Sequence, residues 1–234
     1  MKTLLKASLL LLLSSATLLH AGSITVGNAD SGNCYPFMCN DSGTSSGVSI
    51  DYQQAFVSSA FPGTTTINTI SWGFWPYQGS PIVLGGDYSF YWGYSAVGLG
   101  LGSYLPGNYS GAADFLGTAF VPAGGENFGS TLTLSGFAPF TYNPLDGDLL
   151  LEIVVSNQDN VCNGCGNGYN WADYTGATTT RDYSFLGSLY GTGAEVGALQ
   201  TTFGTSTVTP EPGSLLLLGT GLMSLAGMLR RKRA

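Results

Sequence analysis

The octapeptide Asp87-Tyr88-Ser89-Phe90-Tyr91-Trp92-Gly93-Tyr94 places a large aromatic ring at every second position. Successive side chains of a β-strand point to opposite faces, so Tyr88, Phe90, Trp92 and Tyr94 share one face. The other face carries Asp87, Ser89, Tyr91 and Gly93, which are mostly small or polar. Residues 87–94 therefore predict a strand that turns one face towards an aromatic core.

A second strong pattern lies at residues 149–155, which are apolar except for one acid. The alternating set Leu149, Leu151, Ile153 and Val155 is expected to point inward. Glu152 shares the opposite face with Leu150 and Val154, so we expect this strand to be half buried on its second face as well.

Weaker strand patterns occupy much of the remaining chain. In residues 64–75, Ile70, Trp72 and Phe74 share one face. Further β-type runs lie at 23–26, 48–56, 131–135, 182–189 and 199–207, and residues 98–111 are rich in Gly, Ser and Leu. About eight to ten strands at this spacing, without a helical period between the chain ends, are typical of all-β sandwiches. We predict an all-β fold, a single antiparallel, jelly-roll-like β-sandwich over residues 22–203, followed by a linker at 204–209.

The charge balance excludes one class of ligand. Between residues 22 and 209 the chain has Arg181 as its one basic residue and thirteen acids, which gives a net charge of −12. A nucleic-acid-binding protein needs a basic face to neutralise phosphates, and this domain cannot form one. The 35 Gly, 13 Tyr and 12 Phe of the chain indicate a packed β domain rather than disorder.

The N-terminus has the pattern of a secretory signal peptide. Lys2 and Lys6 precede a leucine-rich stretch that includes residues 9–13, and Ala21 offers a small residue for cleavage. We expect a signal-peptide helix over residues 1–21, removed after export by the Sec machinery. Cleavage after Ala16 is an alternative.

The C-terminus combines three features in a fixed order. The motif Pro210-Glu211-Pro212 comes first, and its two prolines cannot continue a helix and hold the residues before them, Thr209 and Glu211, extended. An uncharged run at 213–229 follows, and its 17 residues would form a short transmembrane helix of roughly 25 Å. The basic tail 230–233 is expected to remain cytoplasmic. An ordinary single-pass anchor with a proline hinge would have the same physical features.

This C-terminal stretch resembles the PEP-CTERM sorting signal of exported bacterial proteins. The resemblance rests on the Pro-Glu-Pro motif, the short apolar span and the basic tail of residues 210–234, in that order. It implies recognition and cleavage by an exosortase, a membrane protein of exopolysaccharide-producing Gram-negative bacteria. It also implies an inner-membrane intermediate that is anchored by its C-terminus, and a final location at the cell surface or in the extracellular matrix.

The four cysteines of the exported part allow three disulfide pairings. An even number of cysteines in an oxidising compartment favours disulfides, and we expect the local pairs Cys34–Cys39 and Cys162–Cys165. A zinc site with four thiolates and a CxxC redox centre are the alternatives.

The residue types in the exported part of the chain allow few catalytic mechanisms. The only histidine, His20, belongs to the signal peptide, so the mature chain cannot use Ser-His-Asp or Cys-His catalysis, and it has no lysine nucleophile. Acid pairs could still serve a glycosidase, but nothing in the sequence selects one pair. Asp146, Asp148 and Asp159 could supply oxygen ligands for calcium, but they lack EF-hand spacing, and a β-hairpin turn explains Asp146-Gly147 more simply. We predict no catalytic residues, no metal and no cofactor.

Carbohydrate binding remains open because aromatic side chains can stack on sugar rings. The cluster Tyr169, Asn170, Trp171 and Asp173 combines two rings with polar neighbours, although a loop in which Trp171 caps the core is the simpler interpretation. The sequence thus predicts an exported, non-enzymatic surface or matrix protein that is associated with polysaccharide. A carbohydrate-binding module is the alternative, and a carboxylate-based glycan hydrolase is a third hypothesis.

Overall fold

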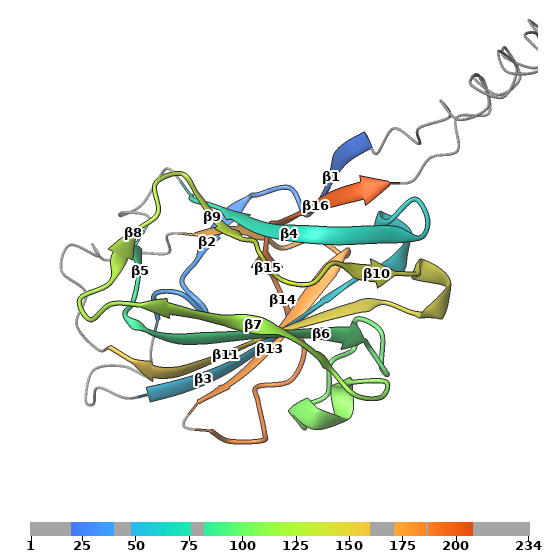
Figure 1. Cartoon of the computed structure of the whole chain (residues 1–234). Coiled ribbons are helices and arrows are strands. Elements are labelled where there is room, and N and C mark those ends of the chain that lie inside the picture. The colour runs from blue at the N-terminus through green and yellow to red at the C-terminus, as the bar shows by residue number, and fades with distance from the viewer. Residues whose placement is uncertain (1–19, 40–47, 76–81, 160–170, 186, 208–234) are drawn as a thin grey trace, which may run out of the picture. The chain divides into compact units, whose positions relative to one another are not determined.

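The computed structural model describes residues 20–39, 48–75, 82–159, 171–185 and 187–207 (Figure 1). The chain divides into a compact unit, Gly22–Thr205, and a second unit made of the two chain ends. The compact unit corresponds closely to the domain expected at 22–203, and the description below concerns this unit.

Two antiparallel sheets form the body of the compact unit (Figure 1). The five-stranded sheet contains β1 (His20–Val26), β16 (Thr201–Thr207), β4 (Thr65–Gly73), β10 (Phe140–Tyr142) and β9 (Thr131–Leu134). The six-stranded sheet contains β14 (Glu195–Val196), β13 (Thr179–Phe185), β3 (Val48–Phe56), β11 (Leu149–Gln158), β6 (Gly86–Tyr94) and β7 (Asp114–Val121).

Smaller elements complete the described part of the fold. They are a sheet of β15 (Ala198–Leu199), β12 (Trp171–Tyr174) and β2 (Ser31–Asn33), the pair β5 (Ile82–Val83) and β8 (Glu126–Asn127), and the 3₁₀-helices η1 (Ser58–Ala60), η2 (Leu105–Asn108) and η3 (Pro144–Asp146).

The two large sheets face each other across an aromatic core, which confirms the predicted all-β sandwich. Trp72 of β4 lies against Phe90 of β6, with ring centroids 6.0 Å apart. Trp92 of β6 lies 4.2 Å from Phe140 of β10. The strands β3, β4 and β6 alternate between the two sheets, whereas β6 and β7 are neighbours in the six-stranded sheet, which also contains both β11 and β13.

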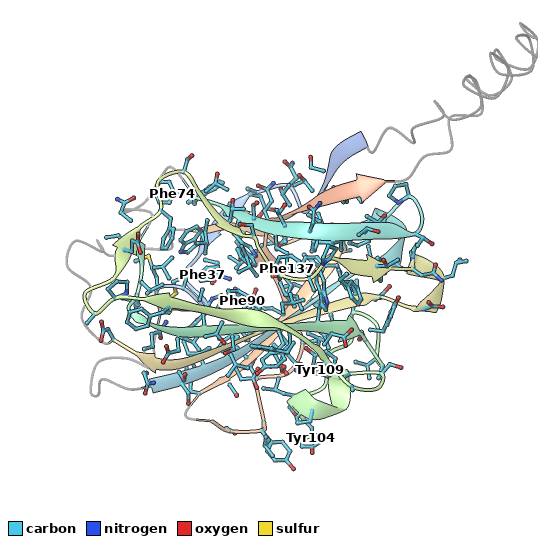
Figure 2. The ribbon with its side chains drawn as sticks, in the orientation of Figure 1. Phe37, Phe74, Phe90, Tyr104, Tyr109 and Phe137 are labelled. Atoms are coloured by element: carbon cyan, nitrogen blue, oxygen red, sulfur yellow. A yellow bond between two sulfur atoms is a disulfide. The ribbon has the colours of Figure 1, made fainter. Side chains whose placement is uncertain are left out.

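The strongest sequence pattern is confirmed in detail. In β6, Tyr88, Phe90 and Trp92 are buried between the sheets, while Asp87, Ser89 and Tyr91 are only partly covered. Figure 2 shows Phe90 and Phe137 between the two layers. β11 also agrees with its prediction, because its inward residues are buried and Leu150 is buried on the opposite face.

The alternation of buried and partly exposed residues in β4 shifts by one residue within the strand, which periodicity alone did not predict. Thr65 and Ile67 are buried at one end, whereas Ile70 and Trp72 are buried at the other. The strand also changes partner there, since β10 pairs with residues 65–67 and β9 with residues 70–73. A change of partner allows the inward-facing set to move from odd to even positions.

The boundaries at the chain ends differ from the expectation. β16 extends to Thr207, so residues 204–207 belong to a strand and not to the expected linker 204–209. They pair because β16 lies between β1 and β4 in the five-stranded sheet. β1 begins at His20, so its first two residues fall within the expected signal peptide 1–21. The signal-peptide helix and the transmembrane helix 213–229 fall outside the described residues.

Candidate functional site

The ends of the folded unit lie in neighbouring strands. The hydroxyl oxygens of Thr25 in β1 and Thr202 in β16 are 2.9 Å apart. Gly22 and Thr205, each three residues nearer its own chain end, are also neighbours, since a Cβ atom added to Gly22 would lie 3.3 Å from Thr205 Oγ1. β1 and β16 are therefore antiparallel, and the strand that leads into the C-terminal tail pairs with the first strand of the exported domain.

The sorting residues Pro210, Glu211 and Pro212 lie outside the described residues, as does the basic tail 230–233. Because β16 ends at Thr207, only residues 208 and 209 separate the last strand from Pro210. In the part of the chain that the structure describes, no helix is long and apolar enough to cross a membrane.

The cysteine prediction is confirmed for one pair. Cys34 and Cys39 form a disulfide that closes a turn, in which Met38 N donates to Cys34 O at 2.7 Å. Cys162 and Cys165 lie outside the described residues. A zinc site with four thiolates is excluded, because two of its ligands are consumed in the disulfide.

The predicted sugar-binding cluster does not expose its tryptophan. Trp171 lies in β12, is fully buried and packs 5.2 Å from the ring of Phe37. Asp173 is 6% exposed, with its Oδ2 3.8 Å from Arg181 Nη1. Tyr169 and Asn170 fall outside the described residues. A buried indole has no free face for a sugar ring, so Trp171 acts as a core residue, which was the simpler reading of this cluster.

The one basic residue of the exported domain is engaged within the fold. Arg181 of β13 lies 3.2 Å from Glu195 Oε2 through its Nε atom. Its guanidinium also lies 5.7 Å from the centroid of the Tyr183 ring. The cation thus stabilises the fold and leaves the surface dominated by acids.

A buried polar network covers the outer face of the six-stranded sheet. Gln53 of β3 donates to Glu152 Oε1 at 2.6 Å and to the carbonyl oxygen of Leu105 at 3.1 Å. Asn108 of η2 donates to Gln53 Oε1 at 2.9 Å and also bonds both backbone groups of Gly102. The network therefore fastens the loop around η2 to the sheet.

Two carboxyl groups are in contact within this network. Asp51 of β3 is hydrogen-bonded to Glu152 of β11, and Asp182 of β13 lies nearby. Burial, followed by the charge of Glu152 and the hydrogen bond to it, raises the pKa of Asp51 to about 8. Asp51 therefore keeps its proton at neutral pH. Glycosidases hold their two acids about 5 to 9.5 Å apart on either side of the bond that is cleaved, and two carboxyl groups in direct contact lack that separation.

Asp182 holds a second loop. It is fully buried, and its Oδ1 atom accepts hydrogen bonds from Gly193 N at 2.9 Å and from Thr192 Oγ1 at 3.1 Å. Asp182 is the register partner of Gln53 on the neighbouring strand. Two polar side chains that lie opposite each other in the sheet thus fasten two different loops.

Sequence reasoning did not single out these outer-face residues. The available signal was the face shared by Leu150, Glu152 and Val154, which predicted partial burial of an acid. The burial of Asp51 and Asp182 depends on loops that are distant in the sequence, so the strand patterns alone did not indicate it.

The sandwich also has a mainly apolar pocket of about 180 Å³ near β7 and β9 that is partly open to the surface. Its lining includes Phe37, Trp72, Phe90, Phe128 and Leu132. These side chains belong to the core or pack against it, so the pocket reflects loose packing at the open edge of the sandwich.

Comparison with known proteins identifies one segment. A family model, described as the PEP-CTERM protein-sorting motif, matches residues 208–233. Comparison with curated proteins gave no match to the chain, and comparison with solved structures gave none either. The matched residues begin directly after the last residue of β16. Such a motif implies export, a membrane-anchored intermediate and processing by an exosortase. The folded β-sandwich of this chain is therefore followed by a PEP-CTERM protein-sorting motif.

Proposed function

We propose that this chain is a non-enzymatic protein of the cell surface or extracellular matrix, exported by the Sec machinery and released from its anchor by an exosortase. The observation that carries the proposal is the sorting motif at 208–233, joined directly to the last strand of a folded unit. In this mechanism the protein is the substrate of the processing enzyme, and the β-sandwich is its cargo.

The chemistry of the exported domain supports a non-catalytic role. Its residues 22–209 contain neither histidine nor lysine, and their one arginine is paired with Asp173 and Glu195. Glu152, which contacts Asp51, accepts a hydrogen bond from Gln53, and Gln53 fastens the loop through Leu105 O. Each of these groups has a structural role that accounts for its position.

Replacement of Pro210, Glu211 and Pro212 by alanines tests the sorting mechanism. In the native host, the parent chain should be shortened at both ends and recovered from the surface or matrix, while the triple variant should accumulate as an anchored form of higher mass. Intact-mass measurement of membrane and extracellular fractions reports both outcomes. Leu145→Ala, a change at a side chain that is 91% exposed, is the control that should be processed normally. Normal processing of the triple variant would reduce the tail to an ordinary anchor.

Carbohydrate binding is a second candidate function, and association with an extracellular polysaccharide would explain a location in the matrix. Trp171 cannot carry this function from the core. The observation that favours it is a different pair of rings, Tyr104 and Tyr190, which are 47% and 65% exposed. A soluble-glycan and insoluble-glycan binding assay on the intact protein tests it.

A further inference from the structure

Two tyrosine rings stand side by side on the surface of the described unit. Tyr104 precedes η2, and Tyr190 lies in the loop that follows β13. Their ring centroids are 5.4 Å apart, and their planes meet at 45°. Figure 2 shows Tyr104 at the end of its loop, outside the two layers. With exposures of 47% and 65%, both rings keep much of their surface in water.

Backbone hydrogen bonds fix the two rings relative to each other. Leu105 N donates to the carbonyl oxygen of Leu189 at 3.0 Å, and Gly191 N donates to that of Ser103 at 2.7 Å. These bonds bracket an antiparallel bridge between Tyr104 and Tyr190. The pair is therefore preorganised, which reduces the entropy lost when a ligand binds.

The buried network beneath the rings fastens each loop to the sheet. Gln53 holds the loop of Tyr104 through Leu105 O, and Asn108 links the same loop to Gln53. Asp182 holds the loop of Tyr190 through the backbone N–H of Gly193. Because Gln53 and Asp182 are opposite each other in the sheet, two rings that are far apart in the sequence are presented from one rigid base.

The surroundings of the rings indicate the chemistry of the ligand. The face of an aromatic ring carries partial negative charge, which attracts the polarised C–H groups on the apolar face of a sugar. Ser103 lies next to Tyr104 and is exposed, so it offers a hydroxyl group to a glycan. The hydroxyl groups of Ser188 and Thr192 on the other loop are used within the fold, since they bond Tyr190 O and Asp182 Oδ1. The net charge of −12 on residues 22–209 repels polyanions. A neutral glycan fits both properties.

We propose that Tyr104 and Tyr190 form the binding platform for a neutral polysaccharide. This inference rests on the second candidate function and names its residues and its ligand class. It is independent of sorting, because the platform lies on the folded unit and its binding is measured with purified protein. Failure of exosortase processing and failure of glycan binding are therefore separate results.

The rings also have a purely structural interpretation, in which they stabilise the contact between the two loops. Cross-strand aromatic pairs do contribute to stability. The structural role predicts that removal of one ring lowers the melting temperature without an effect on any ligand, whereas the platform predicts a loss of binding at nearly unchanged stability. The experiment must therefore measure both quantities.

The test uses the full chain in detergent and pull-down isotherms on cellulose, chitin, an insoluble β-1,3-glucan and mannan, with alginate gel as the anionic probe. The parent should bind at least one neutral polysaccharide and leave alginate unbound. Tyr104→Ala and Tyr190→Ala should each weaken that binding by about tenfold, the effect of one stacking contact. The double variant should lose it. Tyr190→Phe keeps the ring and should bind like the parent.

The matched controls are Phe115→Ala and Phe120→Ala, which remove exposed rings elsewhere, at 59% and 71% exposure, and should leave the isotherms unchanged. Thermal unfolding of every variant checks the fold. If Tyr190→Ala does not fold, Tyr190→Ser replaces it in the binding assay. The proposal is overturned if the parent binds none of the neutral polysaccharides, if it binds alginate alone, or if the folded double variant binds as tightly as the parent.

Discussion

The two faces of the six-stranded sheet are built from alternate residues of the same strands, yet they are held together differently. On the inner face, Phe90, Trp92 and Ile153 are buried in an apolar core. On the outer face, Gln53 and Asp182 are equally buried but are polar, and loops cover them. Alternation specifies which residues share a face, whereas the tertiary structure determines whether that face meets a second sheet, a loop or water.

This difference sets how each face stabilises the protein. The inner face is stabilised by the removal of apolar area from water, an effect that depends little on the exact orientation of the side chains. The outer face gains little from burial itself and depends on every polar group finding a partner, since an unpaired buried group costs about 1–3 kcal/mol. The outer face is consequently the more specific of the two, and it is the face that positions the loops of Tyr104 and Tyr190.

Trp92→Ala should have the largest effect on stability. The ring is 1% exposed and packs against Phe137 and Phe140, so its loss removes apolar contacts and leaves a cavity between the sheets. We expect the free energy of unfolding to fall by about 3–5 kcal/mol, measured by urea denaturation.

The control for this prediction is the outward-facing neighbour on the same strand. Ser89 bonds the hydroxyl of Thr118 at an exposed site, so Ser89→Ala should change the free energy by less than about 0.5 kcal/mol. If Trp92→Ala and Ser89→Ala lowered the free energy of unfolding by similar amounts, the inner face would not be the apolar core that the comparison assumes.

Most of the inner face could be predicted from the sequence because it depends on local periodicity. The rings of β6 and the alternating aliphatic residues of β11 are buried as their spacing indicates. The phase change in β4 could not be predicted, because it follows from a change of partner strand. Residues 204–207 were assigned to a linker because their Gly, Thr and Ser composition resembles one, while the pairing of β16 with its neighbours makes them a strand.

The sites divide in the same way. The Cys34–Cys39 bridge and the sorting motif are local in the sequence and were predicted. The tyrosine pair joins positions 104 and 190 through loop contacts, for which one sequence gives no signal. Trp171 was a sugar-binding candidate because its neighbours are polar, but the simpler interpretation as a core residue is the one observed, since β12 pairs with β2 and β15 and buries it.

Asn108→Ala should have an intermediate effect and acts on the outer face alone. It leaves Gln53 Oε1 and both backbone groups of Gly102 without their partner, which should cost about 1–3 kcal/mol. Ser103→Ala, an exposed change on the same loop, is the control and should cost less than about 0.5 kcal/mol. A double-mutant cycle with Gln53→Ala should show a coupling of about 0.5–3 kcal/mol. Strict additivity would mean that the two side chains do not act as one network.

A further prediction concerns the pH dependence of stability. The Asp51 carboxyl faces Glu152 of β11, Asp182 of β13 and the Tyr109 side chain, which follows η2. The pKa of Asp51 is about 8 in the folded protein, against 3.8 for an ordinary aspartate. Between these two values the folded state keeps a proton that the unfolded state has released. Stability therefore falls as pH rises from about 4 to about 8 and is unaffected by this group above that range.

Asp51→Asn removes this titration and keeps a neutral group beside Glu152, so it should flatten the decline and leave the variant more stable than the parent at pH 8. Glu152→Gln removes the neighbouring charge that raises the pKa of Asp51, and it should also make the decline shallower. The measurement is the midpoint of urea unfolding at half-unit steps between pH 5 and pH 8.5. Curves for parent and Asp51→Asn that run parallel across this range would show that the carboxyl pair is open to water. In that case the outer face would be solvated like an ordinary sheet surface, and the buried base assigned to the tyrosine platform would lose its support.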